Sequence, residues 1–293
     1  MTEQNLSAPR APEPPVPPVP PVPPGPPAPE EPQAGPAAAK DRRVLRAVLR
    51  WTAAVAVFAA VGTSTAYGIT RMERTDVPGL ATESDGRWDY PTLTRPPLPS
   101  GSPGPLAGSN RAGTHHIDLR ELVLPAPDGA KDDAKLRGED GWLDTEVFLS
   151  EYAVEEDRDE FRQELVDRGL RHIAARGWTM EDGTRTRIYL LRFDTATVVD
   201  GLFQDGLAPN SSPKYRLRGT EESRFDEDYP KQARVDGVHR LAYVETDPSG
   251  AEQVRHAYLG SGDTVALVVQ SRKGGARAVP FQQTVVLQSR LLS

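Results

Sequence analysis

The chain has 293 residues, of which 37% are hydrophobic and 26% are charged, and its formal net charge is −7. It contains no cysteine, which excludes a disulfide framework, thiolate metal sites and cysteine nucleophiles. Of its 29 prolines, 15 precede residue 41, nine lie between 78 and 127, and five follow. This distribution leaves one folded region of about 165–180 residues at the C-terminal end, which is large enough for a single sizeable core.

Residues 1–40 form a proline-rich tail that we predict to be disordered. Residues 8–36 repeat proline pairs every three positions, and proline removes the amide donor that helices and sheets need. In polyproline II, with three residues per turn, Val16, Val19 and Val22 line one edge of an extended rod. Two interpretations remain open. The tail is a stiff, soluble segment without a dedicated partner, or its P-x-x-P spacings recruit a cytoplasmic partner with an aromatic groove.

Residues 41–70 comprise a basic flank and a predicted transmembrane helix over 51–70. This twenty-residue window carries no charge and is bounded by Arg50 and Arg71. At about 1.5 Å per residue, twenty helical residues span the roughly 30 Å of bilayer hydrocarbon. We therefore expect the lipid bilayer to be the partner of residues 51–70.

The charges around this segment predict its orientation. Only Arg71 and Arg74 follow it closely, whereas five basic residues precede it: Lys40, Arg42, Arg43, Arg46 and Arg50. Because positive flanks stay in the cytoplasm, we expect a cytoplasmic N-terminus and an extracytoplasmic C-terminal domain, in a single-pass protein of the cell membrane. A cleaved signal peptide is the alternative, with cleavage near Ala66, but the N-terminal extension is long for one.

The next segment, residues 71–114, is rich in Pro, Gly, Ser and Thr and has no helical or strand periodicity. We predict it to be a flexible extracytoplasmic linker. The folded domain is then residues 115–293, with 24 Lys and Arg against 32 Asp and Glu. An acidic surface of this kind repels phosphate backbones, so no nucleic-acid partner is expected.

Helices and strands alternate along the domain. Residues 155–176 are predicted to be helical, because Phe161, Leu165, Gly169 and Ile173 recur at four-residue spacing. A hairpin is predicted from 178–181 and 185–193 around Asp182-Gly183, followed by a helix over 195–207. Further strands are predicted over the ranges 238–246, 252–259 and 264–271, and a terminal helix from Pro280.

Residues 178–207 and 252–292 both have the order strand, turn, strand, helix. The pattern predicts an α+β fold in two layers, with helices packed on one face of an antiparallel sheet and with two ββα halves. This domain follows the single transmembrane helix and the disordered proline-rich segments.

No constellation of catalytic, cofactor-binding or metal-binding residues stands out. His115, His116 and Asp118 are the nearest approach to a metal-ligand set, but they lie at the end of the linker, where solvated side chains are more common. His172, His239 and His256 are isolated in the sequence and are interpreted as structural, and the acidic run from Glu221 to Asp228 as a solvated loop. We expect no catalytic site, no cofactor and no metal.

Several short runs resemble a known group of proteins. They are Gly177-Trp178-Thr179, Asp182-Gly183-Thr184, the strand Arg187–Phe193 and the run Gly262–Val269, in a chain with 29 Arg and six Lys. These runs resemble uncharacterised actinobacterial (streptomycete-type) single-pass membrane proteins with proline-rich cytoplasmic tails. More distantly, they are similar to envelope lipoprotein and kinase-ectodomain sensor folds. The resemblance covers about residues 140–293 and brings no functional residue with it.

The combined features predict a membrane-anchored extracytoplasmic module of the cell envelope that binds or senses an envelope ligand or protein and is not an enzyme. One alternative is a scaffold that recruits a cytoplasmic partner through the proline-rich tail. The other is an enzyme whose site is assembled from dispersed acids and histidines, which requires two such groups within hydrogen-bond reach in a pocket.

Overall fold

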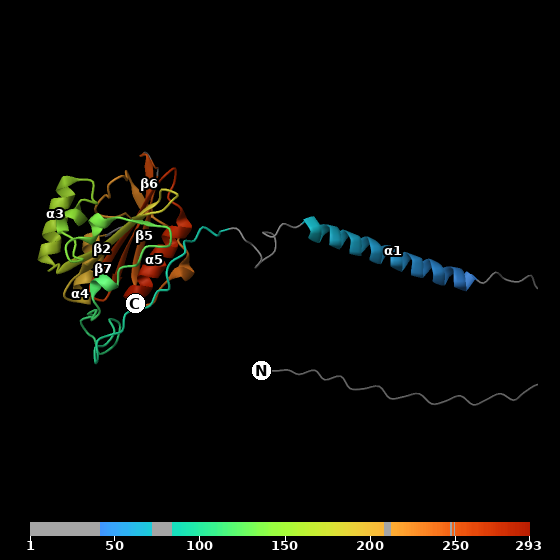
Figure 1. Ribbon diagram of the computed structural model, residues 1–293, viewed down its shortest axis with the longest axis horizontal. Helices are drawn as coiled ribbons and strands as arrows, with labels where there is room; N and C mark the ends of the chain where they lie inside the picture. The colour runs from blue at the N-terminus through green and yellow to red at the C-terminus, as the bar shows by residue number, and fades with distance from the viewer. Residues whose placement is uncertain (1–41, 72–83, 208–211, 247, 249) are drawn as a thin grey trace, which may run out of the picture. The chain divides into compact units, whose positions relative to one another are not determined.

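The computed structural model describes residues 42–71, 84–207, 212–246, 248 and 250–293 (Figure 1). The chain divides into two compact units, Met1–Ala81 and Thr82–Ser293. The proline-rich tail and residues 72–83 of the predicted linker lie outside the described residues, so the predictions made for them stay predictions.

The first unit contains one long helix, α1 (Arg42–Arg71). It is ten residues longer than the predicted span of 51–70, because the basic flank from Arg42 onward continues the same helix. Its apolar side chains are exposed, and the ring of Phe58 is 81% accessible. The helix is long and apolar enough to cross a membrane.

The second unit is built around one antiparallel sheet of seven strands in the order β1-β2-β3-β7-β6-β5-β4. The strands are β1 (Lys131–Asp132), β2 (His172–Thr179), β3 (Arg185–Arg192), β4 (Ser223–Phe225), β5 (His239–Glu245), β6 (Glu252–Ser261) and β7 (Thr264–Lys273). Strands β3 and β7 pair at the centre, in the register Ile188↔Val268 and Leu190↔Ala266. The predicted antiparallel α+β class is confirmed.

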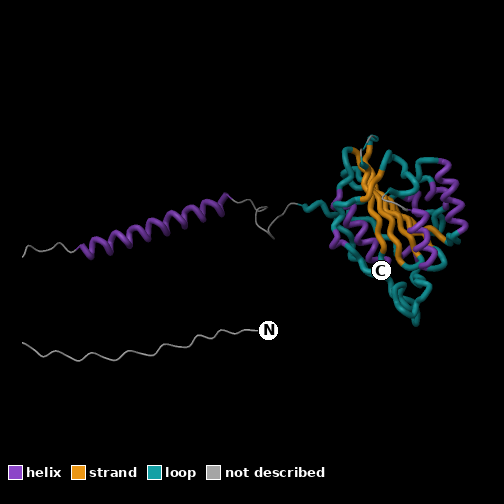
Figure 2. The backbone as a smooth tube through the Cα atoms, turned by 180° about the vertical axis from the view of Figure 1, so that it is seen from behind, coloured by secondary structure: helices purple, strands orange, loops and turns teal. Residues whose placement is uncertain are grey.

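Helices cover both faces of this sheet (Figures 1 and 2). The α-helices of the domain are α2 (Thr145–Leu149), α3 (Glu155–Asp167), α4 (Ala196–Gly201) and α5 (Ala278–Leu292). Shorter turns are η2 (Leu119–Glu121), η3 (Ala134–Arg137), the π-helical η4 (Leu202–Leu207) and η5 (Lys231–Ala233). The hydrophobic core is split by the sheet into two clusters, one under α2, α3 and α4 and the other under α5.

The prediction of helices on one face is therefore wrong in that detail. β7 shows the reason, because Val265 and Leu267 enter the first cluster while Ala266 and Val268 enter the second. A strand that is apolar on both sides needs cover on both sides. The two predicted ββα units are present as β2-β3-α4 and β6-β7-α5, but their helices lie on opposite faces. A two-fold axis perpendicular to the sheet would superpose the β2-β3 hairpin on the β6-β7 hairpin. It would not superpose α4 on α5, because such a rotation keeps each helix on its own face of the sheet.

The helix predicted over 155–176 ends nine residues early. After Asp167 the chain reaches Gly169 at φ +73°, and the amide of Leu170 donates to the carbonyl of Leu165 at 2.9 Å. This is a Schellman-type stop, in which glycine adopts the left-handed conformation. The apolar spacing continued past that stop by coincidence, because Ile173 belongs to β2, where its side chain is buried in the sheet.

The described part of the predicted linker is packed against the domain. The Trp88 amide donates to Gln283 Oε1 of α5 at 2.8 Å, and the hydroxyl of Tyr90 lies 2.9 Å from that of Thr284. Both rings also pack against the cluster under α5. The domain therefore begins near residue 82 rather than at 115, because a few aromatic side chains anchor a segment whose composition is typical of linkers.

Candidate functional site

The histidines singled out from the sequence are dispersed. His116 is exposed beside buried His115, and Asp118 caps η2 instead of joining them. His172 is exposed and stacks on Trp142, and His239 is exposed on β5. Among the described residues, no group of three or more His, Asp and Glu is placed to hold a metal ion.

The acidic run from Glu221 to Asp228 is not a uniform solvated loop. Asp226 is buried, and its carboxylate accepts from Arg255 Nη1 at 2.9 Å. The other acidic residues of the run are exposed. One carboxylate of this run is therefore a structural ion-pair partner on the sheet.

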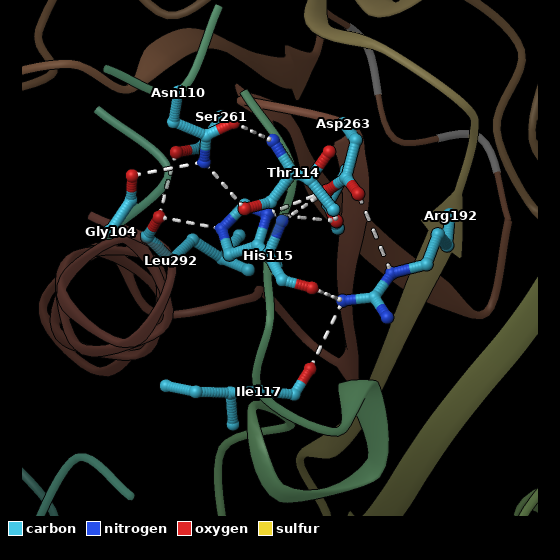
Figure 3. A network of polar contacts seen from close by, with 10 residues as sticks. Gly104, Asn110, Thr114, His115, Ile117, Arg192, Ser261, Asp263 and Leu292 are labelled. Atoms are coloured by element: carbon cyan, nitrogen blue, oxygen red, sulfur yellow. Dashed lines mark hydrogen bonds and ion pairs between the residues drawn. The ribbon is translucent and has the colours of Figure 1, made fainter. Parts of the chain in front are cut away.

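The most extensive buried polar network surrounds His115 (Figure 3). Its Nδ1 lies 2.7 Å from Asp263 Oδ1, in the turn between β6 and β7, and its Nε2 lies 3.0 Å from the carbonyl oxygen of Leu292 in α5. Carboxylate and carbonyl oxygens only accept hydrogen bonds. The two contacts therefore fix the orientation of the ring between the β6–β7 turn and α5.

Neighbouring groups complete this network. Arg192, at the end of β3, donates from Nη2 to the carbonyls of His115 and Ile117, and its Nε lies 3.7 Å from Asp263 Oδ2. The Thr264 hydroxyl donates to Asp263 Oδ1 at 3.0 Å. The network thus joins β3, the β6–β7 turn, α5 and the segment that enters the domain.

Two glycines allow this entering segment to approach so closely. Gly113 and Gly262 have φ of +67° and +50°, and the carbonyl of Gly113 accepts from the Asp263 amide at 2.9 Å. A Cβ at Gly262 would lie 2.1 Å from the Gly113 oxygen, so any other residue there would separate the two backbones. Asn110 shapes the preceding loop by accepting from the Thr114 amide and donating to the carbonyls of Gly104 and Thr114.

The His115–Asp263 pair is engaged on every side. A general base needs a free ring nitrogen within reach of substrate, and here both nitrogens already have partners. His115 and Asp263 are 4% and 1% exposed. The adjacent cavity of about 330 Å³ is lined by Ser261 and Gly262 but by neither member of the pair. As it stands, the arrangement can fasten the entering segment through buried hydrogen bonds, and it presents no catalytic group to solvent.

His256 has the opposite environment. It is fully buried on β6, stacks on Tyr243 at 5.0 Å between ring centroids, and neither ring nitrogen has a hydrogen-bond partner. Burial lowers the pKa of His256 to about 3, which keeps the ring neutral. Its position supports the structural interpretation made from the sequence.

Sequence reasoning missed Asp263 and Arg192 entirely. His115 and Asp263 lie 148 positions apart, and no local spacing connects them. The only local signal was the Gly-rich turn around Asp263, which predicted a hairpin and carried no information about what packs on it.

Comparisons with known proteins add little. No protein-family model matches the chain, and no curated protein matches it. The crystal structure of an uncharacterised protein from Mycobacterium smegmatis is similar at 12% identity, over 60% of this chain and 83% of that one, with a TM-score of 0.27. A score this low carries no argument about fold or function, and the family suggested by the sequence runs stays a prediction.

Proposed function

We propose that this protein is a single-pass membrane protein whose C-terminal domain is a non-enzymatic binding or sensing module on the extracytoplasmic side of the cell envelope. The observation that carries the proposal is α1, a 30-residue helix whose apolar side chains are exposed along its length. Helical side chains of this kind require lipid when no protein covers them.

The polar groups inside α1 support a lipid environment. The hydroxyls of Thr52, Thr63 and Thr65 each donate to the carbonyl four residues earlier, at 2.6–2.8 Å. Threonine that bonds its own backbone leaves no unsatisfied donor in hydrocarbon. The excess of arginine before the helix favours a cytoplasmic N-terminus, which would leave the domain outside.

The His115–Asp263 pair supports a role other than catalysis. The enzyme alternative required a histidine and a carboxylate within hydrogen-bond reach in a pocket, and this pair meets the distance. Its burial and its fully engaged nitrogens favour a fastening role. The network also fixes the segment that leads from α1 into the sheet, which suits a domain that has to stay attached to its anchor.

Reporter fusions at residue 293 test the topology. Alkaline phosphatase fused at this position should be active, because it folds only outside the cytoplasm. Green fluorescent protein fused at the same position should be dark, because it becomes fluorescent only inside the cytoplasm. A variant lacking residues 42–71 is the matched control and should show the reverse. A fluorescent fusion of the full chain would contradict the proposal. An immunoblot that shows loss of the first 66 residues would replace the anchor with a cleaved signal peptide.

A further inference from the structure

A pocket with an excess of positive charge lies at the edge of the sheet, where β1 leaves β2. Its cavity measures about 470 Å³. It is lined by the apolar side chains of Val123, Ala126 and Ala174 and by three arginines, which are Arg120, Arg137 and Arg176. Small-molecule sites commonly have this composition, with a concave apolar surface and a few convergent polar groups, and fall in this range of volume.

The three arginines differ in what they contact. Arg137 forms an ion pair with Asp132, and Arg120 donates from Nε to Asp118 at 3.0 Å while its guanidinium lies 4.8 Å from the centre of the Trp142 ring. Arg176 has neither an ion pair nor a hydrogen bond with any residue in the described ranges. Asp132 is the one carboxylate that lines the cavity.

The position of Arg176 makes this missing partner costly. The side chain of Arg176 is half-buried on β2, and this burial lowers its pKa. The carboxylate of Asp132 raises the pKa and the guanidinium of Arg137 lowers it, but each of these effects is smaller than that of burial. The nearby carboxylate of Asp132 is paired with Arg137, and a guanidinium partly withdrawn from water without an ion-pair partner favours an anion that reaches it. No ion pair or hydrogen bond among the described residues uses this charge to stabilise the fold.

The open edge of β2 adds main-chain groups to the pocket. The carbonyl of Ile173 accepts from the Leu143 amide and that of Gly177 from the Asp133 amide, both at 2.8 Å. Because outward-pointing backbone groups recur every second residue, Ala175 directs its N–H and C=O to the same edge, between these two bonds. A backbone donor therefore lies in the wall beside Arg176.

A constrained loop holds the opposite wall. Gly138 has φ +62°, and a Cβ there would lie 1.9 Å from the Trp142 carbonyl oxygen. Asp140 has φ +54°, which is rare outside glycine and recurs at functional sites. Its carbonyl accepts from Arg120 Nη1 at 2.8 Å and so holds that guanidinium in place. The cationic wall is preorganised.

We propose that this pocket binds a small organic anion, whose oxyanion group accepts hydrogen bonds from Arg176 and whose apolar body lies on Val123 and Ala174. The inference rests on the proposed binding role and adds the chemical class of the ligand. Carboxylate and phosphate groups share the required chemistry, since both accept the two parallel hydrogen bonds of a guanidinium.

The test uses the full-length protein in a non-ionic detergent, with sodium butyrate, sodium butyl phosphate and inorganic phosphate at constant ionic strength against chloride. Butyrate or butyl phosphate should raise the unfolding temperature in a saturable way, and the stronger of the two identifies the head group. Inorganic phosphate should act more weakly, because it leaves the floor uncovered. An equal response to inorganic phosphate would overturn the assignment of an organic anion.

Variants of Arg176 separate binding from stability. Arg176→Gln should weaken the saturable response at least tenfold and leave the unfolding temperature without anion unchanged or raised, since it removes an unpaired half-buried charge. Arg176→Lys keeps the charge without the planar fork and should give an intermediate affinity. Arg224→Gln, at an exposed position on β4 at the opposite edge of the sheet, is the matched control and should bind like the original protein.

Three further results would overturn the inference: no saturable response to any probe, an unchanged response in Arg176→Gln, or a lower unfolding temperature of Arg176→Gln without anion. The reporter fusions distinguish a failure of this inference from a failure of the proposed function. A domain found in the cytoplasm that still binds anions would contradict the function alone, whereas an extracytoplasmic domain without anion binding would contradict this inference alone.

Discussion

His115 and His256 are both buried in the same domain, yet they have opposite environments. Each ring nitrogen of His115 faces an oxygen acceptor, and one of these acceptors is a carboxylate. His256 has aromatic rings around it and no partner for either nitrogen. Equal burial thus gives a fully hydrogen-bonded ring in one place and an unpartnered ring in the other. The difference teaches that the partners, rather than the depth, decide what a buried histidine contributes to stability.

The same distinction separates the His115 network from the arginine pocket. In the network, Arg192 Nη2 donates to two carbonyls and its Nε lies 3.7 Å from Asp263, so Arg192 has an ion-pair partner. Arg176 lines a cavity whose one carboxylate, Asp132, is paired with Arg137. A satisfied network stabilises a structure, whereas an unsatisfied charge beside a cavity is suited to binding.

The largest effect is expected from removing the carboxylate of the network. Asp263→Ala leaves His115 Nδ1 without its buried partner and the guanidinium of Arg192 without its counter-charge. Breaking a buried pair from one side destabilises by about 3–5 kcal/mol. Urea unfolding of the full-length protein, followed by tryptophan fluorescence, measures the change. A loss of stability below about 1 kcal/mol would show that the Asp263 carboxylate does not hold the network together.

The second effect concerns His256 and depends on pH. The ring is neutral in the folded protein down to about pH 3, whereas in the unfolded chain it takes up a proton near its ordinary pKa of 6.5. The unfolded state therefore binds more protons between pH 6.5 and 3, and stability falls as the pH falls through that window, by about 1.4 kcal/mol per pH unit.

His256→Phe removes this titration while keeping a ring against Tyr243. The free energy of unfolding, measured between pH 7.5 and 4.5, should fall less steeply in the variant than in the original protein. The aromatic neighbours Tyr243 and Tyr258 stay neutral there, because burial raises the pKa of both phenols. Identical slopes in the two proteins would mean that His256 has partners when folded.

The smallest effect is expected at an exposed ion pair, which sharpens the comparison with Asp263. Arg171 and Asp194 approach to 2.6 Å, but their side chains are 59% and 54% exposed. Solvent screens such a pair, so Asp194→Ala should cost less than about 1 kcal/mol, and the cost should decrease in high salt. A loss as large as that of Asp263→Ala would contradict the role assigned here to burial.

Local signals in the sequence predicted much of the secondary structure. The Asp182-Gly183 turn identified the β2–β3 hairpin, and the apolar runs identified the strands β3 and β7. One local signal failed at α3, since the spacing of Phe161 and Leu165 runs on through Gly169 into a strand. Apolar periodicity says nothing about whether a glycine adopts the left-handed conformation that ends a helix.

The sequence by itself determined the uncharged segment, the turns, the hairpins and the antiparallel α+β class, because these depend on residues close together in the chain. Only the tertiary structure decided that α4 and α5 cover opposite faces, that residues 84–114 belong to the domain, and that His115 meets Asp263. It alone also decided that Arg176 lines a cavity and has no ion-pair partner among the described residues. Such pairings depend on which distant segments pack together, and no spacing within a single strand or helix records that choice.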